Sequence, residues 1–391
     1  MKFKSALLII LLVFSCAKDT NDNITTATPV NFNFSSILNI DFNNLLNYNN
    51  QYVPVYVTKD NTNGNVITNE VATLGRVLFY DKNLSADNST SCASCHKQVF
   101  AFGDNETASV GSNGTTGRHS MRLVNVRFSN EAKFFWDERA NNLETQTTMP
   151  IKDETEMGFS GTNGQPDFND LITKLNETTY YPTLFEFAFG TTEISEAKMQ
   201  IAMAQFIRSI QSFDSKYDFG RFNAVNDGQP FANFTAQENQ GKNLFLRPPT
   251  FNNQGIRVNG GVGCAGCHQA PEFSIDPNSL NNGVIGTITG TGTDLNVTRS
   301  PSLRDIVKAD GTANGGFMHT GASVNLATVL NHYDEINTAG NTNLDPRLTP
   351  GGNPQQLNLT DTEKQAVIAF MRTLAGTDIY VNEKWSNPFI D

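Results

Sequence analysis

The sequence is poor in basic residues and in cysteine. It has 28 Lys and Arg against 39 Asp and Glu, a formal net charge of −11 at pH 7, and five Cys in 391 residues. Proteins bind nucleic acids largely by neutralising phosphates with cationic side chains, so a chain this acidic is not expected to bind nucleic acid. The same charge favours a basic protein partner.

The N-terminus lacks an apolar run long enough for a mature transmembrane helix. Residues 6–14 are apolar and follow Lys2 and Lys4, which is the pattern of a signal peptide. We therefore predict that residues 1–15 are a signal peptide. The ending Val13-Phe14-Ser15-Cys16 resembles a bacterial lipobox, in which Cys16 becomes the lipidated first residue of a membrane-anchored protein. The alternative is an ordinary signal peptide with an incidental Cys.

The other four cysteines form two copies of one motif. Cys92-Ala93-Ser94-Cys95-His96 and Cys264-Ala265-Gly266-Cys267-His268 both have the form Cys-x-x-Cys-His, which attaches c-type haem. Two thiols at this spacing reach the two vinyl groups of one porphyrin, and the adjacent imidazole ligates the iron. The sequence therefore predicts two covalently bound haem c groups, with His96 and His268 as iron ligands.

Two other uses of Cys-x-x-Cys are less consistent with the sequence. A structural zinc site needs four ligands, and no further Cys lies near either motif. A dithiol redox motif would lie in a βαβ pattern, which the sequence lacks.

Once Cys16 is assigned to lipid and four cysteines to haem, none is left for a disulfide. Haem c is generally attached outside the cytoplasm in bacteria. We therefore expect an exported lipoprotein of the cell envelope, facing the periplasm or the surface.

An internal repeat indicates two similar units. Gly75-x-x-Leu78-Phe79 and Gly241-x-x-Leu244-Phe245 each precede a haem motif and have helical periodicity. We expect a mainly α protein of two tandem cytochrome c-like domains with long haem-wrapping loops. The predicted parts are a tether and N-terminal extension at 16–65, docked from about residue 32 to 57, a first haem domain at 66–225 and a second at 226–391.

Two helices and one loop are clear from the pattern. Residues 195–213 place Ala202 and Phe206 on one apolar face. Thr360 and Glu363 form a capping box that opens the last helix. The Gly-, Asn- and Thr-rich stretch at 278–296 is expected to be a loop.

Each haem iron has a second axial position, and its occupant separates electron transfer from reaction with a small molecule. Met318 lies in a Gly-flanked loop after the second haem motif. Thioether ligation raises a haem's potential and suits a centre that accepts electrons, so Met318 is predicted to ligate the second iron. Ordinary core packing is the alternative for this side chain.

Ordered motifs over residues 66–376 resemble the bacterial di-haem cytochrome c peroxidases. The resemblance rests on the following segments: Leu74-Gly75-x-x-Leu78-Phe79, Leu84-Ser85, Ser91-Cys92-Ala93-Ser94-Cys95-His96, Phe134-Phe135-Trp136-Asp137-x-Arg139, Leu143-Glu144-x-Gln146, Glu156-Met157-Gly158, Arg299-Ser300-Pro301-Ser302-Leu303-Arg304, Phe317-Met318-His319-x-Gly321 and His332-Tyr333.

The resemblance implies a division of labour between the two haems. The first haem, on His96, would react with hydrogen peroxide, and the second would receive electrons from a small donor protein, a cytochrome c or a copper protein. Trp136 matches the family's tryptophan between the haems and would relay electrons. Glu156 matches the distal acid and Gln146 the distal amide. Members of the family are often dimers, so a homodimer is one expectation.

The chemistry explains why an acid is needed at the first haem. Peroxide must lose a proton from one oxygen and gain a proton on the leaving oxygen, and a carboxylate above the iron can carry it. A dry pocket would raise the pKa of that carboxyl group toward the working pH. Outside the resemblance, Glu156 would be interpreted as part of an exposed acidic run.

Two positions depart from the family pattern. Many members carry a His in a Gly-His pair that caps the first iron, and Gly111-Ser112 stands there instead, so we predict an open or water-bound first haem. His119 is the nearby substitute that could act as a removable ligand. It also replaces the Asn that the family supplies to an interhaem calcium ion, and imidazole suits that hard cation poorly, which puts calcium in doubt. Arg118 and Arg122 could pair with haem propionates.

The predicted function is a lipid-anchored di-haem peroxidase that reduces hydrogen peroxide to water. One alternative is a di-haem oxidase of the kind that modifies tryptophans on another protein, a subgroup that lacks Met on its second haem. Another is an electron-transfer lipoprotein without catalysis, which would have both irons capped.

Overall fold

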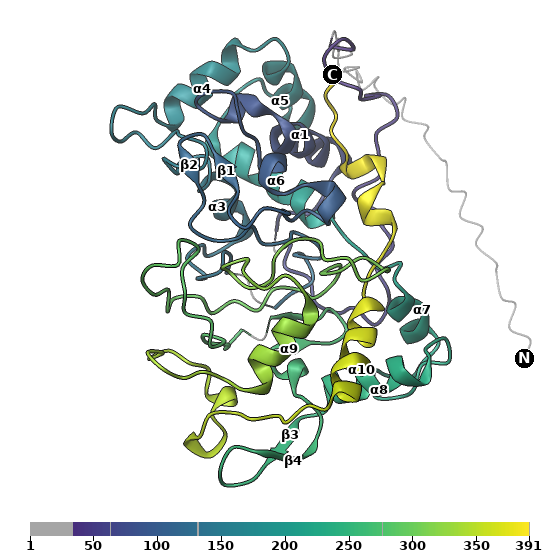
Figure 1. Ribbon diagram of the computed structural model, residues 1–391. Helices are drawn as coiled ribbons and strands as arrows, with labels where there is room; N and C mark the ends of the chain where they lie inside the picture. The colour runs from purple at the N-terminus through teal and green to yellow at the C-terminus, as the bar shows by residue number, and fades with distance from the viewer. Residues whose placement is uncertain (1–33, 63, 131–132, 276, 391) are drawn as a thin grey trace, which may run out of the picture. The chain divides into compact units, whose positions relative to one another are not determined.

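The structure, a computed structural model, describes residues 34–62, 64–130, 133–275 and 277–390. Helices predominate in this part of the chain (Figure 1), and the named strands form only short antiparallel pairs. The helices are α1 (Asn69–Tyr80), α2 (Cys92–Cys95), α3 (Leu143–Thr148), α4 (Phe168–Glu177), α5 (Tyr181–Phe189), α6 (Glu196–Ser209), α7 (Lys216–Phe222), α8 (Ala236–Leu246), α9 (Leu326–Asp334) and α10 (Asp361–Arg372). The paired strands are β1 (Val110–Gly111) with β2 (Gly114–Thr115), β3 (Pro249–Phe251) with β4 (Arg257–Gly260), and β5 (His268–Gln269) with β6 (Ser274–Ile275). The mainly α class is confirmed.

The helix ends follow local side-chain chemistry. Thr360 and Glu363 form the expected reciprocal capping box at the start of α10. Ser195 caps α6 by accepting the N–H of Lys198. The helix then ends at Ser209, earlier than the predicted boundary at residue 213. Residues 278–296 contain no helix or named strand, as expected for a loop.

The repeated glycines explain how two helix pairs approach closely. α1 packs against α6, and α8 packs against α10. A Cβ at Gly75 would collide with the backbone of Ala202 on α6, and a Cβ at Gly241 would collide with the backbone of Ala366 on α10. Each Gly-x-x-Leu-Phe segment therefore places its glycine at a helix crossing that leaves no room for a side chain.

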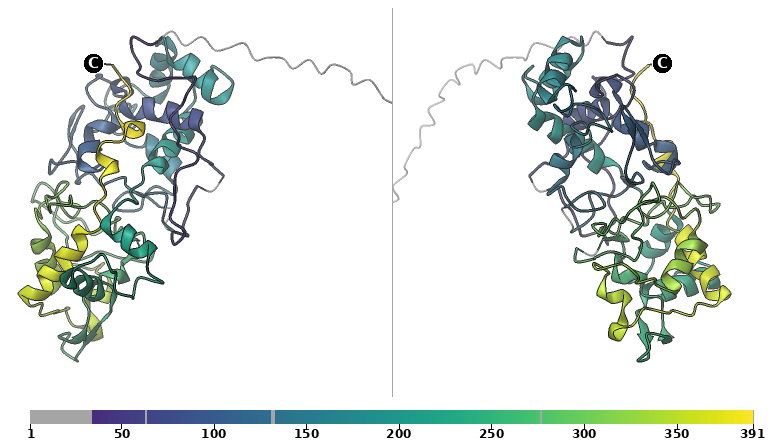
Figure 2. Two further views of the ribbon diagram at one scale, coloured as in Figure 1. Left: turned by 90° about the vertical axis from the view of Figure 1, so that its right-hand side faces the viewer. Right: turned by 60° about the vertical axis from the view of Figure 1, so that its left-hand side comes forward.

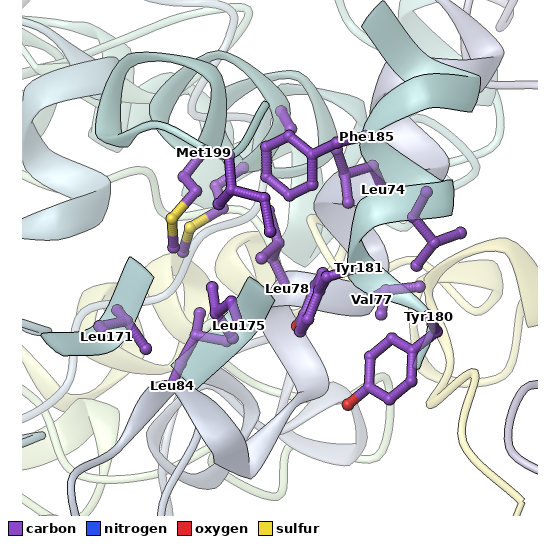
Figure 3. Close-up of a cluster of buried hydrophobic side chains, with 14 of the residues drawn as sticks. Leu74, Val77, Leu78, Leu84, Leu171, Leu175, Tyr180, Tyr181, Phe185 and Met199 are labelled. Carbon is purple, nitrogen blue, oxygen red and sulfur yellow. The ribbon is translucent and has the colours of Figure 1, made fainter. Parts of the chain in front are cut away.

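Buried apolar side chains gather separately in the two halves of the chain. Figure 3 shows one cluster of the first half, in which residues of α1, α5 and α6 meet, including Leu74, Phe185 and Met199. In the second half, Phe245 of α8 and Phe370 of α10 belong to a cluster that also contains residues of α7, α9 and the segments between the helices. The centroids of the two rings are 5.2 Å apart, and the rings meet edge to face.

The C-terminal segment belongs to the core of the first half. Figures 1 and 2 show it running from α10 back to the helices of the first half. Trp385 is 1% exposed and packs in a first-half cluster, where its indole N–H donates to the backbone oxygen of Ser209 at 3.1 Å. Leu38 pairs with Phe389 as an isolated β-bridge. This segment ties the two halves together, and the domain division at residues 225 and 226 stays a prediction.

The N-terminal extension is docked where the structure describes it. Phe34, Leu38 and Tyr48 are buried, as expected for this segment. The predicted signal peptide and Cys16 lie outside the described residues. No described helix combines the length and apolar character needed to cross a membrane.

Candidate active site

The first haem motif opens onto a large cavity. Cys95 and His96 line a cavity of about 480 Å³, here called the first cavity. Cys92 joins them around a smaller adjoining space of about 60 Å³. The Nδ1 atom of His96 lies 3.1 Å from the backbone oxygen of Phe102. Donation from Nδ1 to this oxygen leaves Nε2 available for iron.

The second motif has a cavity of its own. Cys264, Cys267 and His268 line a space of about 520 Å³, here called the second cavity. A narrower space of about 90 Å³, the bridging cavity, lies between the motifs and is also lined by His268. None of the four motif cysteines is in a disulfide.

The chemistry of the cavity walls fits haem. Arg122 lines both the first and the bridging cavities, and its Nε atom is buried with no hydrogen-bond partner among the described residues. Burial lowers the pKa of Arg122 to about 10. A buried guanidinium N–H group without an acceptor is costly, and a haem propionate would supply one, beside the charge of Asp305 that already acts on Arg122.

The predicted distal residues face the same space as His96. Glu156 and Gln146 line the first cavity and the adjoining smaller space. The pKa of Glu156 is raised to about 7, mainly by burial and to a lesser extent by the charge of Asp153, while Arg139 opposes the shift. The structure thus brings together a proximal imidazole, a carboxyl group that titrates near neutral pH and an amide.

The loop that departs from the family pattern packs behind Glu156. The backbone N–H of Ser112 donates to the backbone oxygen of Glu156 at 2.9 Å, and a Cβ at Gly111 would collide with the backbone of Thr155. The Ser112 hydroxyl donates to Asp87 at 2.9 Å. Ser112 is not among the residues that line the first cavity.

His119 lies in the walls of the first and bridging cavities. Its Nδ1 atom is 2.9 Å from the backbone oxygen of Glu106, while its Nε2 atom is buried without a hydrogen-bond partner in the described part of the chain. The backbone N–H of His119 donates to the backbone oxygen of His319 at 2.7 Å. His119 is therefore anchored through both its ring and its backbone, and its capping of the first iron stays a hypothesis.

Trp136 also lines both the first and the bridging cavities. Its indole N–H donates to the backbone oxygen of His119 at 2.7 Å. Its own backbone oxygen accepts hydrogen bonds from the N–H groups of Thr298 and Arg299. Segments of both halves therefore fix this ring between the two haem motifs.

Comparisons with known proteins agree with this arrangement. The family model described as di-haem cytochrome c peroxidase matches residues 69–223. The chain is 26% identical to the methylamine utilization protein MauG of Methylophilus methylotrophus, over 80% of this chain and 84% of that protein. It is 27% identical to the cytochrome c551 peroxidase of Nitrosomonas europaea, over 78% of this chain and 80% of that protein.

A solved structure extends the likeness to the fold. A MauG-like protein associated with microbial copper homeostasis superposes with a TM-score of 0.66 at 26% identity, covering 87% of this chain and 99% of its own. The chain therefore resembles the di-haem cytochrome c peroxidases, by the family model over residues 69–223 and by these relatives over most of its length. The protein is therefore a haem-dependent oxidoreductase with two haem groups.

The sixth ligand of the second haem has two candidates in this chain. Met318 lines the bridging cavity together with His268, and its backbone is left-handed, with φ of 64°. Tyr333, which follows His332 on α9, lines both the bridging and the second cavities with His268. Sequence reasoning noted His332-Tyr333 only as part of the resemblance and gave Tyr333 no role. The available signal was its position near the end of an amphipathic helix after the second motif.

The family's calcium ion fits this chain poorly. Arg118 donates two hydrogen bonds to Asp294, at 2.7 and 3.0 Å, and one to Asp137 at 2.6 Å. Arg139 also pairs with Asp137. No group of three or more His, Cys, Asp or Glu in the described ranges could hold a metal ion. The local carboxylates are already neutralised by guanidinium groups, and Arg118, which also lines the first cavity, is paired with Asp137 and Asp294.

Proposed function

We propose that the protein reduces hydrogen peroxide to water at the first haem, with two electrons taken singly from a small redox protein at the second haem. The observation that carries this proposal is the placement of Glu156 and Gln146 on the first cavity together with His96. An electron carrier without catalysis does not need a distal acid with a raised pKa.

Haem bound at the first motif would supply an iron centre on which peroxide is activated and reduced. Glu156, as the carboxylate, takes the proton from the nearer oxygen of peroxide and returns it to the leaving oxygen. Its pKa of about 7 suits it to both steps near neutral pH. The Gln146 amide orients peroxide by donating a hydrogen bond as charge develops on oxygen.

Trp136 is proposed as the electron relay. It lines the first cavity as well as the bridging cavity, where His268 is also found. The haems would be held covalently by the cysteines of the two motifs, with Arg122, rather than Arg118, as the better placed partner for a propionate. The donor is a cytochrome c or a copper protein.

We also propose where the protein is located, how it is anchored and how it assembles. The protein is an exported lipoprotein held through Cys16 in the cell envelope, facing the periplasm or the surface, and a homodimer is compatible with its family. These statements rest on the sequence of the N-terminus and on the family resemblance.

A second candidate function follows from Tyr333. If Tyr333 rather than Met318 ligates the second iron, the argument against a di-haem oxidase that acts on a protein or a small molecule is removed. Tyr333 lines the same large cavity as Cys264 and Cys267, whereas Met318 lines only the bridging cavity. This observation keeps the oxidase as the runner-up.

Electron paramagnetic resonance of the oxidised protein separates these cases. We expect one high-spin signal from an open first haem and one low-spin signal from the second. Substitution Met318→Leu should alter the low-spin signal, and Tyr333→Phe should leave it unchanged. The reverse pattern favours the oxidase, and two low-spin signals without a high-spin signal contradict the open first haem.

Peroxide turnover tests the function itself. The variant Glu156→Gln should lower kcat/KM by about 10²–10⁴-fold, the usual contribution of a general acid and base. Glu154→Gln is the matched control, because Glu154 lies in the same acidic run but lines neither the first cavity nor its smaller neighbour. Equal activity of both variants and the wild type contradicts the proposed role of Glu156.

A further inference from the structure

Asn282 lies between the two candidate ligands of the second haem. Its side-chain Nδ2 donates to the Met318 sulfur at 3.3 Å and to the Tyr333 hydroxyl oxygen at 3.1 Å. It lines the second cavity and the bridging cavity, and His268 lines both as well. One amide group therefore uses its two N–H bonds on the two side chains that compete for the iron.

The orientation of this amide is fixed by its other contacts. Its Oδ1 atom accepts the backbone N–H of Val284 at 3.1 Å, so the nitrogen must point toward Met318 and Tyr333. The Nε2 atom of His332 lies 2.8 Å from the backbone oxygen of Asn282 and donates to it. Because His332 precedes Tyr333 on α9, this bond holds the loop that carries Asn282 in a fixed position relative to the helix.

We propose that Asn282 is a positioning residue that sets the ligation and the reduction potential of the second haem. This inference rests on one part of the proposed function, which is that the second haem receives the electrons. Hydrogen bonds from a second layer of residues orient a ligand and tune its metal, and they are among the levers that set haem potentials. Asn282 provides such bonds to both Met318 and Tyr333.

The sign of the effect is the same for either ligand. An N–H aimed at the ligating atom carries partial positive charge toward the iron and withdraws electron density from the ligand. Both effects favour the reduced iron, so Asn282 raises the reduction potential of the second haem. The side chain that is not a ligand would keep its hydrogen bond to the same amide.

The experiment is a spectroelectrochemical titration of the fully loaded protein, with electron paramagnetic resonance of its oxidised form. Asn282→Leu removes both donors, so we expect a lower potential and an altered low-spin signal for the second haem, with the first haem unchanged. Asn282→Gln keeps an amide donor and should lie closer to the wild type. Asn353→Leu is the control, because the Asn353 amide also donates a hydrogen bond, in its case to the backbone oxygen of Asn253, but lies on neither cavity.

The proposal is overturned if Asn282→Leu leaves the potential and the low-spin signal of the second haem as in the wild type. If that variant does not load haem, Asn282→Ser decides by the same criteria, since serine is too short to reach both partners. A shifted potential in a protein that does not turn over peroxide would sink the proposed function and leave this role of Asn282 intact.

Discussion

The indole Nε1 of Trp136 donates a hydrogen bond to the backbone oxygen of His119 at 2.7 Å. This bond holds the ring in the wall shared by the first and bridging cavities. Trp136→Phe keeps an aromatic ring but loses the indole and its anchor. We expect electron passage from the second haem to the first to slow, measured by rapid mixing of the half-reduced protein with peroxide.

Trp385→Phe is the matched control for this prediction. Trp385 also donates its indole N–H to a backbone oxygen, that of Ser209, but it lies in the core and lines none of the three cavities. The Trp385→Phe substitution should lower the melting temperature and leave the rate of electron passage unchanged. Equal passage rates in Trp136→Phe and the wild type would remove Trp136 from the path.

The pH dependence of peroxide turnover should follow Glu156. The carboxylate is the form that accepts the first proton, so kcat/KM should rise with pH and level off above the pKa of about 7. Glu156→Gln should abolish this inflection. A wild-type profile that is flat across neutral pH would contradict the assignment.

The same group links pH to stability. Burial raises the pKa of Glu156 from 4.5 to about 7, so the folded state favours the protonated form. Its contribution to stability is complete below the unfolded pKa and is lost as pH rises through about 7. Relative to Glu156→Gln, the melting temperature of the wild type should therefore fall between about pH 5 and about pH 8.

Calcium should not be required. Arg118 already bridges Asp137 and Asp294, and the Arg118, Asp137 and Asp294 side chains are 22, 17 and 14% exposed. Arg118→Gln should lower the free energy of unfolding by about 1–3 kcal/mol, which lies between the values for surface and buried ion pairs. A chelator should leave the melting temperature of the wild type unchanged.

Arg127→Gln provides the comparison. Its pair with Asp60 is more exposed, with Asp60 at 40%, so its loss should cost about 0–1 kcal/mol. Stoichiometric calcium found in the purified protein by elemental analysis would contradict this account of Arg118.

The repeated glycines give a stability prediction. Gly75→Ala and Gly241→Ala should each lower the free energy of unfolding by about 1–3 kcal/mol, because the added methyl group forces apart two helices that are in direct contact. Gly286→Ala is the control, since a Cβ there meets no atom within 4 Å. Thermal or denaturant unfolding measures all three, and a neutral Gly241→Ala would refute the close-contact explanation.

Local chemistry made much of this structure predictable. The capping box at Thr360 and the repeat around Gly75 and Gly241 determine where helices start and where they can touch, and both are visible in a few residues. The return of Trp385 to the first-half core could not be predicted, because it depends on contacts between distant residues, such as Ser209 and Trp385, which are 176 positions apart.

The candidate site was predictable only in part. Glu156 and Gln146 were found by resemblance, and the raised pKa of Glu156 depends on burial that no local pattern reveals. The position of Tyr333 beside the second haem motif was missed because an aromatic residue on an amphipathic helix usually packs in the core. The ion pairs of Arg118 join three distant segments and also required the structure.

The most direct test of the account is the oxidation of a reduced small cytochrome by hydrogen peroxide, catalysed by the fully haem-loaded wild-type protein. The account predicts steady turnover that consumes two reduced cytochromes per peroxide. No turnover above the uncatalysed rate, with both haems present, would contradict it.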